Sequence, residues 1–256
     1  MIFSYRNYKK ICDVISGCSG DVVIKHDVEL LSKSSLDLAK IEHDFGIRSI
    51  FFYQFDVFIK DVEMVKEISR LGHEIGYHYD VLDNNKGDFS AAALEFEENL
   101  RVFSDNGFDI KWICPHGNPI IERNGWNSNK DFFRDSSIRE KYNDLKDIVV
   151  EKEIFYPDFV YVSDAGYSFK EVSSVSNNDK VYSEDFKIKD FPSYLRKKGC
   201  SSYIISTHPH RWVESDSLFM TKFLLFMFLK WTYKITHRLP GLSRVYSQFF
   251  RFSRKF

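Results

Sequence analysis

Four short segments of this chain each place a histidine or a carboxylate at the end of an apolar, strand-like run. They read VVIKHDVE (22–29), HEIGYHYD (73–80), WICPHGNP (112–119) and YIISTHPHRW (203–212). In a βα barrel the carboxyl ends of the strands meet on one face, so residues far apart in sequence would share one pocket. We expect that pocket to hold Asp27, His78, His116 and His208. Such a set suits a divalent metal with general acid–base chemistry around it.

The first two segments offer oxygen and nitrogen ligands. Asp27 is a hard oxygen ligand for a divalent metal, and His26 beside it could act as a base or orient a water. The alternative for Asp27 is a cap of the following helix. His78 and Asp80 share one side of an extended strand, so both could reach a metal. The alternative for His78 is a hydrogen-bonded core residue.

The last two segments hold their histidines at turns. Pro115 and Gly117 force a sharp turn around His116, and Pro209 stops the strand after His208. A turn histidine without chemistry is the alternative reading. Asp164, in the strand-like run YVSDAG, could position the imidazole of His208, or it could simply cap a turn.

The elements that must position these residues alternate along the chain. Apolar runs and helical periodicity predict strands at 22–27, 49–53, 73–78, 111–116, 159–166 and 203–208, with helices at 34–46, 58–72, 89–107 and 190–199. Repeated short βα units predict parallel strands with right-handed crossovers, hence an α/β fold. The polar, Asn-rich stretch 117–152 is expected to be a long functional loop.

Composition bounds the class of protein. A hydrophobic content of 43% with 29% charged residues excludes disorder, and a net charge of −1 does not indicate a partner. The four cysteines form no CxxC pair, so we expect reduced thiols. The N-terminus does not read as a secretory signal, and every apolar stretch is interrupted before it reaches the length of a membrane span. The sequence therefore predicts a cytoplasmic protein.

The C-terminal segment differs from the rest. After Asp216 there is no acidic residue, while eight Lys or Arg residues follow. We expect two parts, a barrel at 1–216 and a basic, aromatic amphipathic segment at 217–256. That segment could contact the inner membrane peripherally, close the barrel, or form an oligomer interface. No nucleic-acid motif accompanies the basic residues.

The motifs KHDVE, GHEIGYH, ICPHG and THPHRW, in this order, resemble the polysaccharide deacetylases of carbohydrate esterase family 4, the NodB-like hydrolases. The resemblance implies a distorted (β/α)7 barrel that removes acyl groups from sugars with a divalent metal. It places Asp27 on a ligand position, His26 on the catalytic base and His208 on the general acid. His78 falls on the first histidine ligand, with Asp80 as a substitute for the second.

Two departures from the family pattern concern the metal shell and the third motif. The usual second ligand histidine is Leu82, which cannot bind a metal, and the usual arginine of the third motif is Ile113. His116 then projects where a metal- or substrate-facing group would sit. A backbone N–H near Pro115 or His116 could stabilise an oxyanion.

The resemblance implies a divergent branch found in bacterial O-antigen and surface-polysaccharide clusters. The implied function is a metal-dependent hydrolase that removes an N-acetyl or N-formyl group from a nucleotide-linked or lipid-linked amino sugar. Zinc is favoured over manganese, iron, cobalt or nickel. His116 and Asn118 would face the substrate, and Trp126 and Trp212 could stack on a sugar ring, although ordinary core packing is the alternative. A sugar-binding or scaffold barrel without activity is the competing class, and a lyase or isomerase a weaker third.

Overall fold

The computed structural model describes residues 2–18, 20–30, 33–118, 121–172, 186–197 and 202–236. The strands are β1 (Val22–Val28), β2 (Ile50–Tyr53), β3 (Glu74–Tyr79), β4 (Trp112–Pro115), β5 (Lys146–Asp147), β6 (Val160–Ser163), β7 (Phe169–Glu171), β8 (Phe186–Ile188) and β9 (Tyr203–Thr207). The helices are α1 (Tyr5–Ser16), α2 (Lys33–Asp44), α3 (Phe55–Phe58), α4 (Val62–Arg70), α5 (Val81–Asn84), α6 (Phe89–Asp105), α7 (Lys130–Arg134), α8 (Ser136–Lys141), α9 (Lys152–Phe155), α10 (Phe191–Lys197), η1 (Pro209–Arg211) and α11 (Asp216–Thr236).

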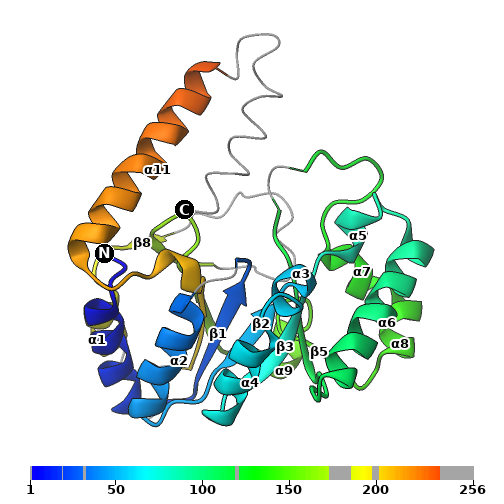
Figure 1. Cartoon of the computed structure of the whole chain (residues 1–256), viewed down its shortest axis with the longest axis horizontal. Helices are drawn as coiled ribbons and strands as arrows, with labels where there is room; N and C mark the ends of the chain where they lie inside the picture. Colours follow the sequence, from blue (N-terminus) through cyan, green and yellow to red (C-terminus); the bar gives the residue numbers. More distant parts are fainter. Residues whose placement is uncertain are drawn as a thin grey trace.

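Among the described residues one nine-stranded sheet, in the order β5-β4-β3-β2-β1-β9-β6-β7-β8, forms the frame of the molecule. From β5 to β6 the neighbouring strands are all parallel, which makes seven parallel strands, and β7 and β8 continue the sheet antiparallel. The helices α1, α2, α4, α6 and α8 surround the strands (Figure 1). The predicted α/β class and distorted (β/α)7 barrel are confirmed, as an open barrel whose sheet ends at β5 and β8.

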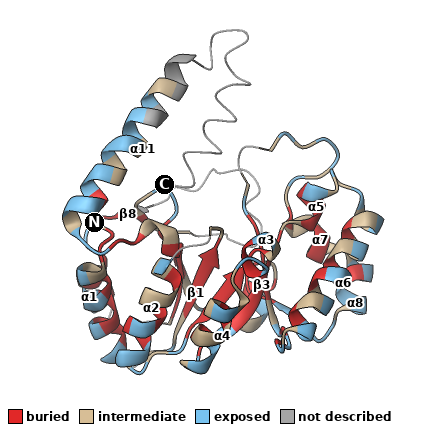
Figure 2. Ribbon diagram, viewed as in Figure 1, coloured by how far each residue is buried: buried red, intermediate tan, exposed pale blue. Residues whose placement is uncertain are grey.

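Strand residues alternate between two faces. The side toward the helices carries large apolar clusters that include Phe51 and Tyr53 of β2. The opposite side carries a smaller cluster that includes Ile50 and Phe52 of the same strand and Cys114 of β4. Figure 2 shows the strands buried and the outer helix surfaces exposed. This alternation decides which polar strand residues meet inside the barrel.

Helix boundaries follow local chemistry. Asp88 caps α6 by accepting hydrogen bonds from the backbone N–H groups of Ser90 (2.9 Å) and Ala91 (3.0 Å). Gly107, with φ +89°, lies just past the end of that helix, where a residue with a Cβ would be strained. All the elements predicted from periodicity are found, with boundaries shifted by a few residues at most.

The expectation of an irregular loop over 117–152 is wrong in part. This stretch contains α7, α8 and β5, and Phe132 and Phe133 of α7 are buried in the main apolar cluster. The elements are too short for their periodicity to be read from sequence. Burial of Phe132 and Phe133 stabilises α7 instead, and α8 buries Ile138.

The helix α11 starts at Asp216 and extends away from the barrel (Figure 1). At its base Phe219 and Phe223 pack against Tyr167 with ring centroids 6.1 and 6.2 Å apart. None of the helices that the structure describes is long and apolar enough to cross a bilayer. The predicted boundary between 216 and 217 stays a prediction, and residues 237–256 of the predicted segment lie outside the described residues.

The cysteines differ in state. Cys12 and Cys114 are free and buried. Cys18 is disulfide-bonded, so the expectation of four reduced thiols is wrong for this residue. The chain has no CxxC spacing by which the sequence could have revealed a disulfide, and Cys200 lies outside the described residues.

Candidate metal and acid–base site

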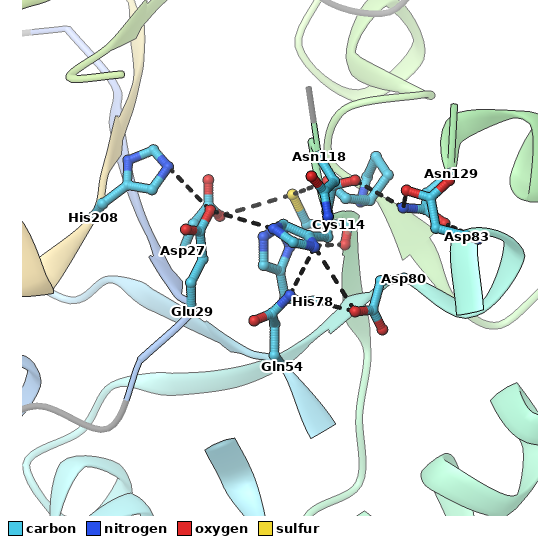
Figure 3. A network of polar contacts seen from close by, with 12 residues as sticks. Asp27, Glu29, Gln54, His78, Asp80, Asp83, Cys114, Asn118, Asn129 and His208 are labelled. Atoms are coloured by element: carbon cyan, nitrogen blue, oxygen red, sulfur yellow. Dashed lines mark hydrogen bonds and ion pairs between the residues drawn. The ribbon is translucent and has the colours of Figure 1, made fainter. Parts of the chain in front are cut away.

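Six polar side chains gather at the carboxyl ends of the parallel strands, and we call them the strand-end cluster (Figure 3). They come from β1, β3, β4 and β9 or from the residues that follow these strands. The members are Asp27, Glu29, His78, Asp80, His116 and His208. All but Glu29 and Asp80 are buried, and these two side chains keep 18% and 26% of their surface exposed. The expected meeting of Asp27, His78, His116 and His208 on one side of the sheet is therefore found.

Two overlapping groups in this region have the donors to hold a metal ion. In the rim ligand group, defined as Glu29, His78 and His116, one donor atom of each residue lies within 4.8 Å of the others. The buried ligand group, defined as Asp27, His78 and Cys114, meets the same condition. His78 belongs to both groups.

The His78 ring is oriented for coordination. Its Nδ1 donates a hydrogen bond to the carbonyl oxygen of Cys114 (3.0 Å). The lone pair on Nε2 is then available to coordinate a metal. Burial lowers the pKa of His78 to about 4, so the ring is neutral at ordinary pH. A neutral imidazole with one fixed N–H is the form that binds a metal.

Glu29 is the ligand candidate that the sequence motifs missed. Its Oε1 lies 3.6 Å from Nε2 of His116 and 3.6 Å from Nε2 of His208. Burial alone would raise the pKa of Glu29, but the charges of His208, His116, His210 and Arg211 lower it to about 2. The side chain follows Asp27 by two positions, so strand alternation could have identified it.

His208 is held by Asp164 as a paired acid–base unit. Nδ1 of His208 donates to Oδ1 of Asp164 (2.6 Å), and its backbone N–H donates to Oδ2 (3.0 Å). Burial would raise the pKa of Asp164, but His208 and Arg211 keep it below its usual range. The Nε2 atom of His208 therefore faces Glu29. Through its contact with Nδ1, Asp164 is placed to orient the His208 ring.

Lys25 is a second feature that the sequence motifs did not reveal. Its Nζ donates to both carboxylate oxygens of Asp27 at 2.6 and 2.7 Å and lies 3.2 Å from Sγ of Cys114. Ser206 also donates to Asp27 (3.1 Å). Burial would raise the pKa of Asp27, but the charge of the Lys25 ammonium holds it far below its usual range.

His116 is supported on several sides. Gln54 Nε2 and Nδ1 of His116 are 2.7 Å apart, and the Asp80 carboxylate lies 3.8 Å from the same Nδ1. The backbone N–H of His116 donates to the carbonyl of Tyr79 (2.7 Å). That N–H is therefore already used, and Pro115 has none. An oxyanion donor near this turn stays a prediction.

Behind this turn, buried Asp83 accepts hydrogen bonds from three side chains. Arg123 donates twice at 2.7 Å, Trp126 Nε1 at 2.8 Å and Asn129 at 2.9 Å. Asn129 also donates to the carbonyl of His116, and Arg123 to the carbonyl of Asn118 (both 2.9 Å). Trp126 and the Asn118 backbone thus belong to a brace behind the His116 turn, and their predicted contact with substrate stays a prediction.

The structure does not bring His26 to the strand-end cluster. Because neighbouring strand residues point to opposite faces, His26 faces α2 while Asp27 faces the barrel interior. Its Nε2 lies 2.9 Å from Oε1 of Glu42, and its Nδ1 lies 2.6 Å from Oγ1 of Thr207. The expected pairing of His26 with Asp27 on one water is not compatible with this geometry.

Trp212 is also not at the predicted position. It is fully buried, stacks on Phe3 (centroids 4.7 Å apart) and donates from Nε1 to Asp164 (3.1 Å). A side chain without exposed surface cannot stack on a sugar, so the substrate-binding expectation for Trp212 is corrected. Its indole supports Asp164, which carries His208.

No protein-family model matches the chain, and no curated protein sequence matches it. Among solved structures, one similar chain is described as a family 4 carbohydrate esterase from Streptomyces lividans in complex with acetate. The two are 16% identical, with 75% of this chain and 80% of that chain covered at a TM-score of 0.47. So loose a superposition carries no conclusion about fold or activity. The function of this protein must be inferred from the residues of its own site.

Proposed function

We propose that this protein is a metal-dependent hydrolase that removes an acetyl or formyl group from the nitrogen of an amino sugar. The observation that carries the proposal is the rim ligand group beside an acid–base histidine. Its three donor atoms lie within 4.8 Å of one another, and Nε2 of His208 is 3.6 Å from Glu29. Ligands and acid–base groups at the carboxyl ends of parallel strands are the usual arrangement of barrel enzymes.

The residues fit a divalent metal. Catalytic zinc sites commonly have three protein ligands from histidine and carboxylate side chains and keep one position open. Glu29, His78 and His116 match that donor set, and zinc is the metal that we favour over manganese, iron, cobalt or nickel. When bound, such a metal would lower the pKa of a water to about 7 and polarise the acyl carbonyl.

The acid–base work falls to this chain's own side chains. A carboxylate of the cluster, Asp27 or Glu29, takes the proton from the attacking water. His208 then protonates the leaving amine through Nε2, while Asp164 keeps the proton on Nδ1 and fixes the ring. Water and the amide are consumed, and a carboxylic acid and the free amino sugar are formed.

The substrate class and setting rest on the motif resemblance. It favours a nucleotide-linked or lipid-linked amino sugar of bacterial O-antigen or surface-polysaccharide biosynthesis, at the cytoplasmic face of the inner membrane. The disulfide at Cys18 argues against a reducing compartment. The test is to alkylate free thiols in intact cells before lysis. If Cys18 is not alkylated because it is oxidised, the cytoplasmic part of the proposal is overturned.

Peripheral membrane contact is proposed for α11. Leu224, Phe228 and Trp231 of this helix are about 60% exposed, at 62%, 58% and 60%. Lys222, Lys230 and Lys234 provide its charge after Asp216, a composition typical of helices in an anionic membrane interface. Leu224→Glu with Phe228→Glu should abolish co-sedimentation with phosphatidylglycerol vesicles, while Thr221→Glu, on the same exposed helix, serves as the control. Equal binding of all forms would count against the membrane contact.

A barrel that binds sugar without hydrolysis remains the second candidate. Two observations favour it. Lys25 binds both carboxylate oxygens of Asp27, and Leu82, at the position of the family's second ligand, is buried in the apolar core. Sugar binding without acyl release would establish it.

The deciding experiment is elemental analysis of the purified full chain, followed by acyl release from a panel of N-acetyl and N-formyl nucleotide sugars. We expect about one equivalent of metal in the wild type and its loss, with activity, in His78→Ala. His43→Ala, a surface histidine, is the matched control and should behave as wild type. Wild-type protein that takes up no metal, even after addition of zinc, manganese or iron, would overturn the proposed mechanism.

A further inference from the structure

Lys25 places a fixed positive charge inside the barrel. Its side chain is 1% exposed, and its ammonium lies 5.4 Å from the centroid of the Phe52 ring. Its hydrogen-bond partners are the two oxygens of Asp27 and Sγ of Cys114, at 2.6 to 3.2 Å. A buried ammonium of this kind is stabilised by its partners and cannot move into water without rearrangement of the core.

The ammonium occupies the place that a metal would need in the buried ligand group. Zinc ligands lie about 2.0 to 2.3 Å from the ion. An ion at that distance from Asp27 and Cys114 would coincide with Nζ of Lys25 or lie against it, and both are cations. The rim ligand group has no such obstacle, because Glu29 approaches only histidines in its ion pairs among the described residues.

We propose that Lys25 is a positioning residue that excludes metal from Asp27 and Cys114 and confines it to Glu29, His78 and His116. The inference rests on metal binding by the proposed hydrolase and goes beyond it by choosing between two overlapping ligand sets. It also divides the work of the two carboxylates: Glu29 is the ligand, and Asp27, held by Lys25 and Ser206, is the base. This reassigns Asp27 from the ligand position that the motif resemblance implies.

The test uses cobalt(II), whose absorption spectrum reveals a bound thiolate by a charge-transfer band in the near ultraviolet. Metal-free full-length protein is titrated with cobalt and followed by equilibrium dialysis and absorption. In the wild type we expect one equivalent without the thiolate band. Cys114→Ser should leave affinity and spectrum unchanged, whereas Glu29→Gln should weaken binding by about 100-fold or more. Lys25→Met should gain the thiolate band, and Lys25→Met with Cys114→Ser should lose it again.

Several results would overturn the inference. These are a thiolate band in the wild type, weaker binding in Cys114→Ser, or a Lys25→Met spectrum identical to wild type. If circular dichroism shows that Lys25→Met does not fold, the comparison of wild type, Cys114→Ser and Glu29→Gln decides alone. Cobalt bound without a thiolate band, but with no release of any acyl group, overturns the proposed function and leaves the inference standing. No cobalt in any of the proteins overturns both.

Discussion

His26 and Asp27 are neighbours in the sequence, yet they belong to two polar clusters on opposite sides of one strand. His26 is part of what we call the helix-side network, a fully buried set of side chains between the sheet and the helices. Its members are Tyr8, His26, Glu42, Ser49, His73 and Thr207. Asp27 belongs to the strand-end cluster. The two sets contain the same kinds of residue, histidines and carboxylates.

Their spacing differs, and the difference separates structure from chemistry. In the helix-side network the polar contacts close within hydrogen-bond distance, such as 2.6 Å from Ser49 to Glu42 and 2.9 Å from His26 to Glu42. In the strand-end cluster Lys25 and Asp164 hold Asp27 and His208 at 2.6 Å, but Glu29 stands 3.6 Å from both His116 and His208. A buried-edge carboxylate at such distances, as Glu29 is, remains available for a ligand, whereas the closed contacts of the helix-side network stabilise the fold.

The largest effect that separates the two sets is expected from Asp164→Asn. Without the carboxylate the His208 ring loses its fixed orientation and tautomer, so the rate of acyl release should fall by about 100- to 10,000-fold. The pH–rate profile, measured with circular dichroism as a check of folding, reports the change. A profile identical to wild type would remove Asp164 from the mechanism.

On the helix side, Glu42→Gln should act on stability rather than on chemistry. Removing one charge of a buried, hydrogen-bonded pair costs about 3 to 5 kcal/mol of unfolding free energy, measured by urea titration. Glu67→Gln, which breaks the exposed pair with Lys40, is the matched control and should cost less than about 1 kcal/mol. Loss of metal with unchanged stability in Glu42→Gln would contradict the comparison.

Two adjacent residues of β9 give a sharper form of the same contrast. Thr207→Val leaves the buried Nδ1 of His26 without its partner and should cost about 1 to 3 kcal/mol of stability, with kcat/KM unchanged. Ser206→Ala removes the hydrogen bond to Asp27 and should lower kcat/KM instead. If both substitutions affected the same quantity, the two faces would not be functionally distinct.

The smallest expected effect concerns acid stability. Burial lowers the pKa of His73 below its unfolded value of about 6.5, so the unfolded chain takes up a proton that the folded chain refuses as pH falls. The contribution of His73 to the unfolding free energy is therefore fully present above about pH 6.5. It falls below that pH by at most about 1.4 kcal/mol per pH unit. His73→Gln in metal-free protein should flatten the dependence below about pH 6.5. An unchanged slope would assign the acid sensitivity to other groups.

Much of the fold could be predicted because its determinants are local. Apolar runs and helical periodicity mark the strands and helices, and breakers such as Gly72 and Gly107 mark their ends. Parallel order then follows from the alternation of the two. The short elements after residue 117 could not be predicted, because α7 depends on the burial of Phe132 and Phe133 and α8 on the burial of Ile138.

The candidate site was predictable in its principal histidines and less so in its partners. By itself the sequence determined that His78, His116 and His208 follow apolar strands, and the barrel topology then requires them to meet. Only the tertiary structure decided that Glu29 stands among them, that Lys25 holds Asp27, and that Trp212 is buried under Asp164. The reason is physical: strand alternation and register set which face a side chain occupies, and packing sets which distant partner it contacts.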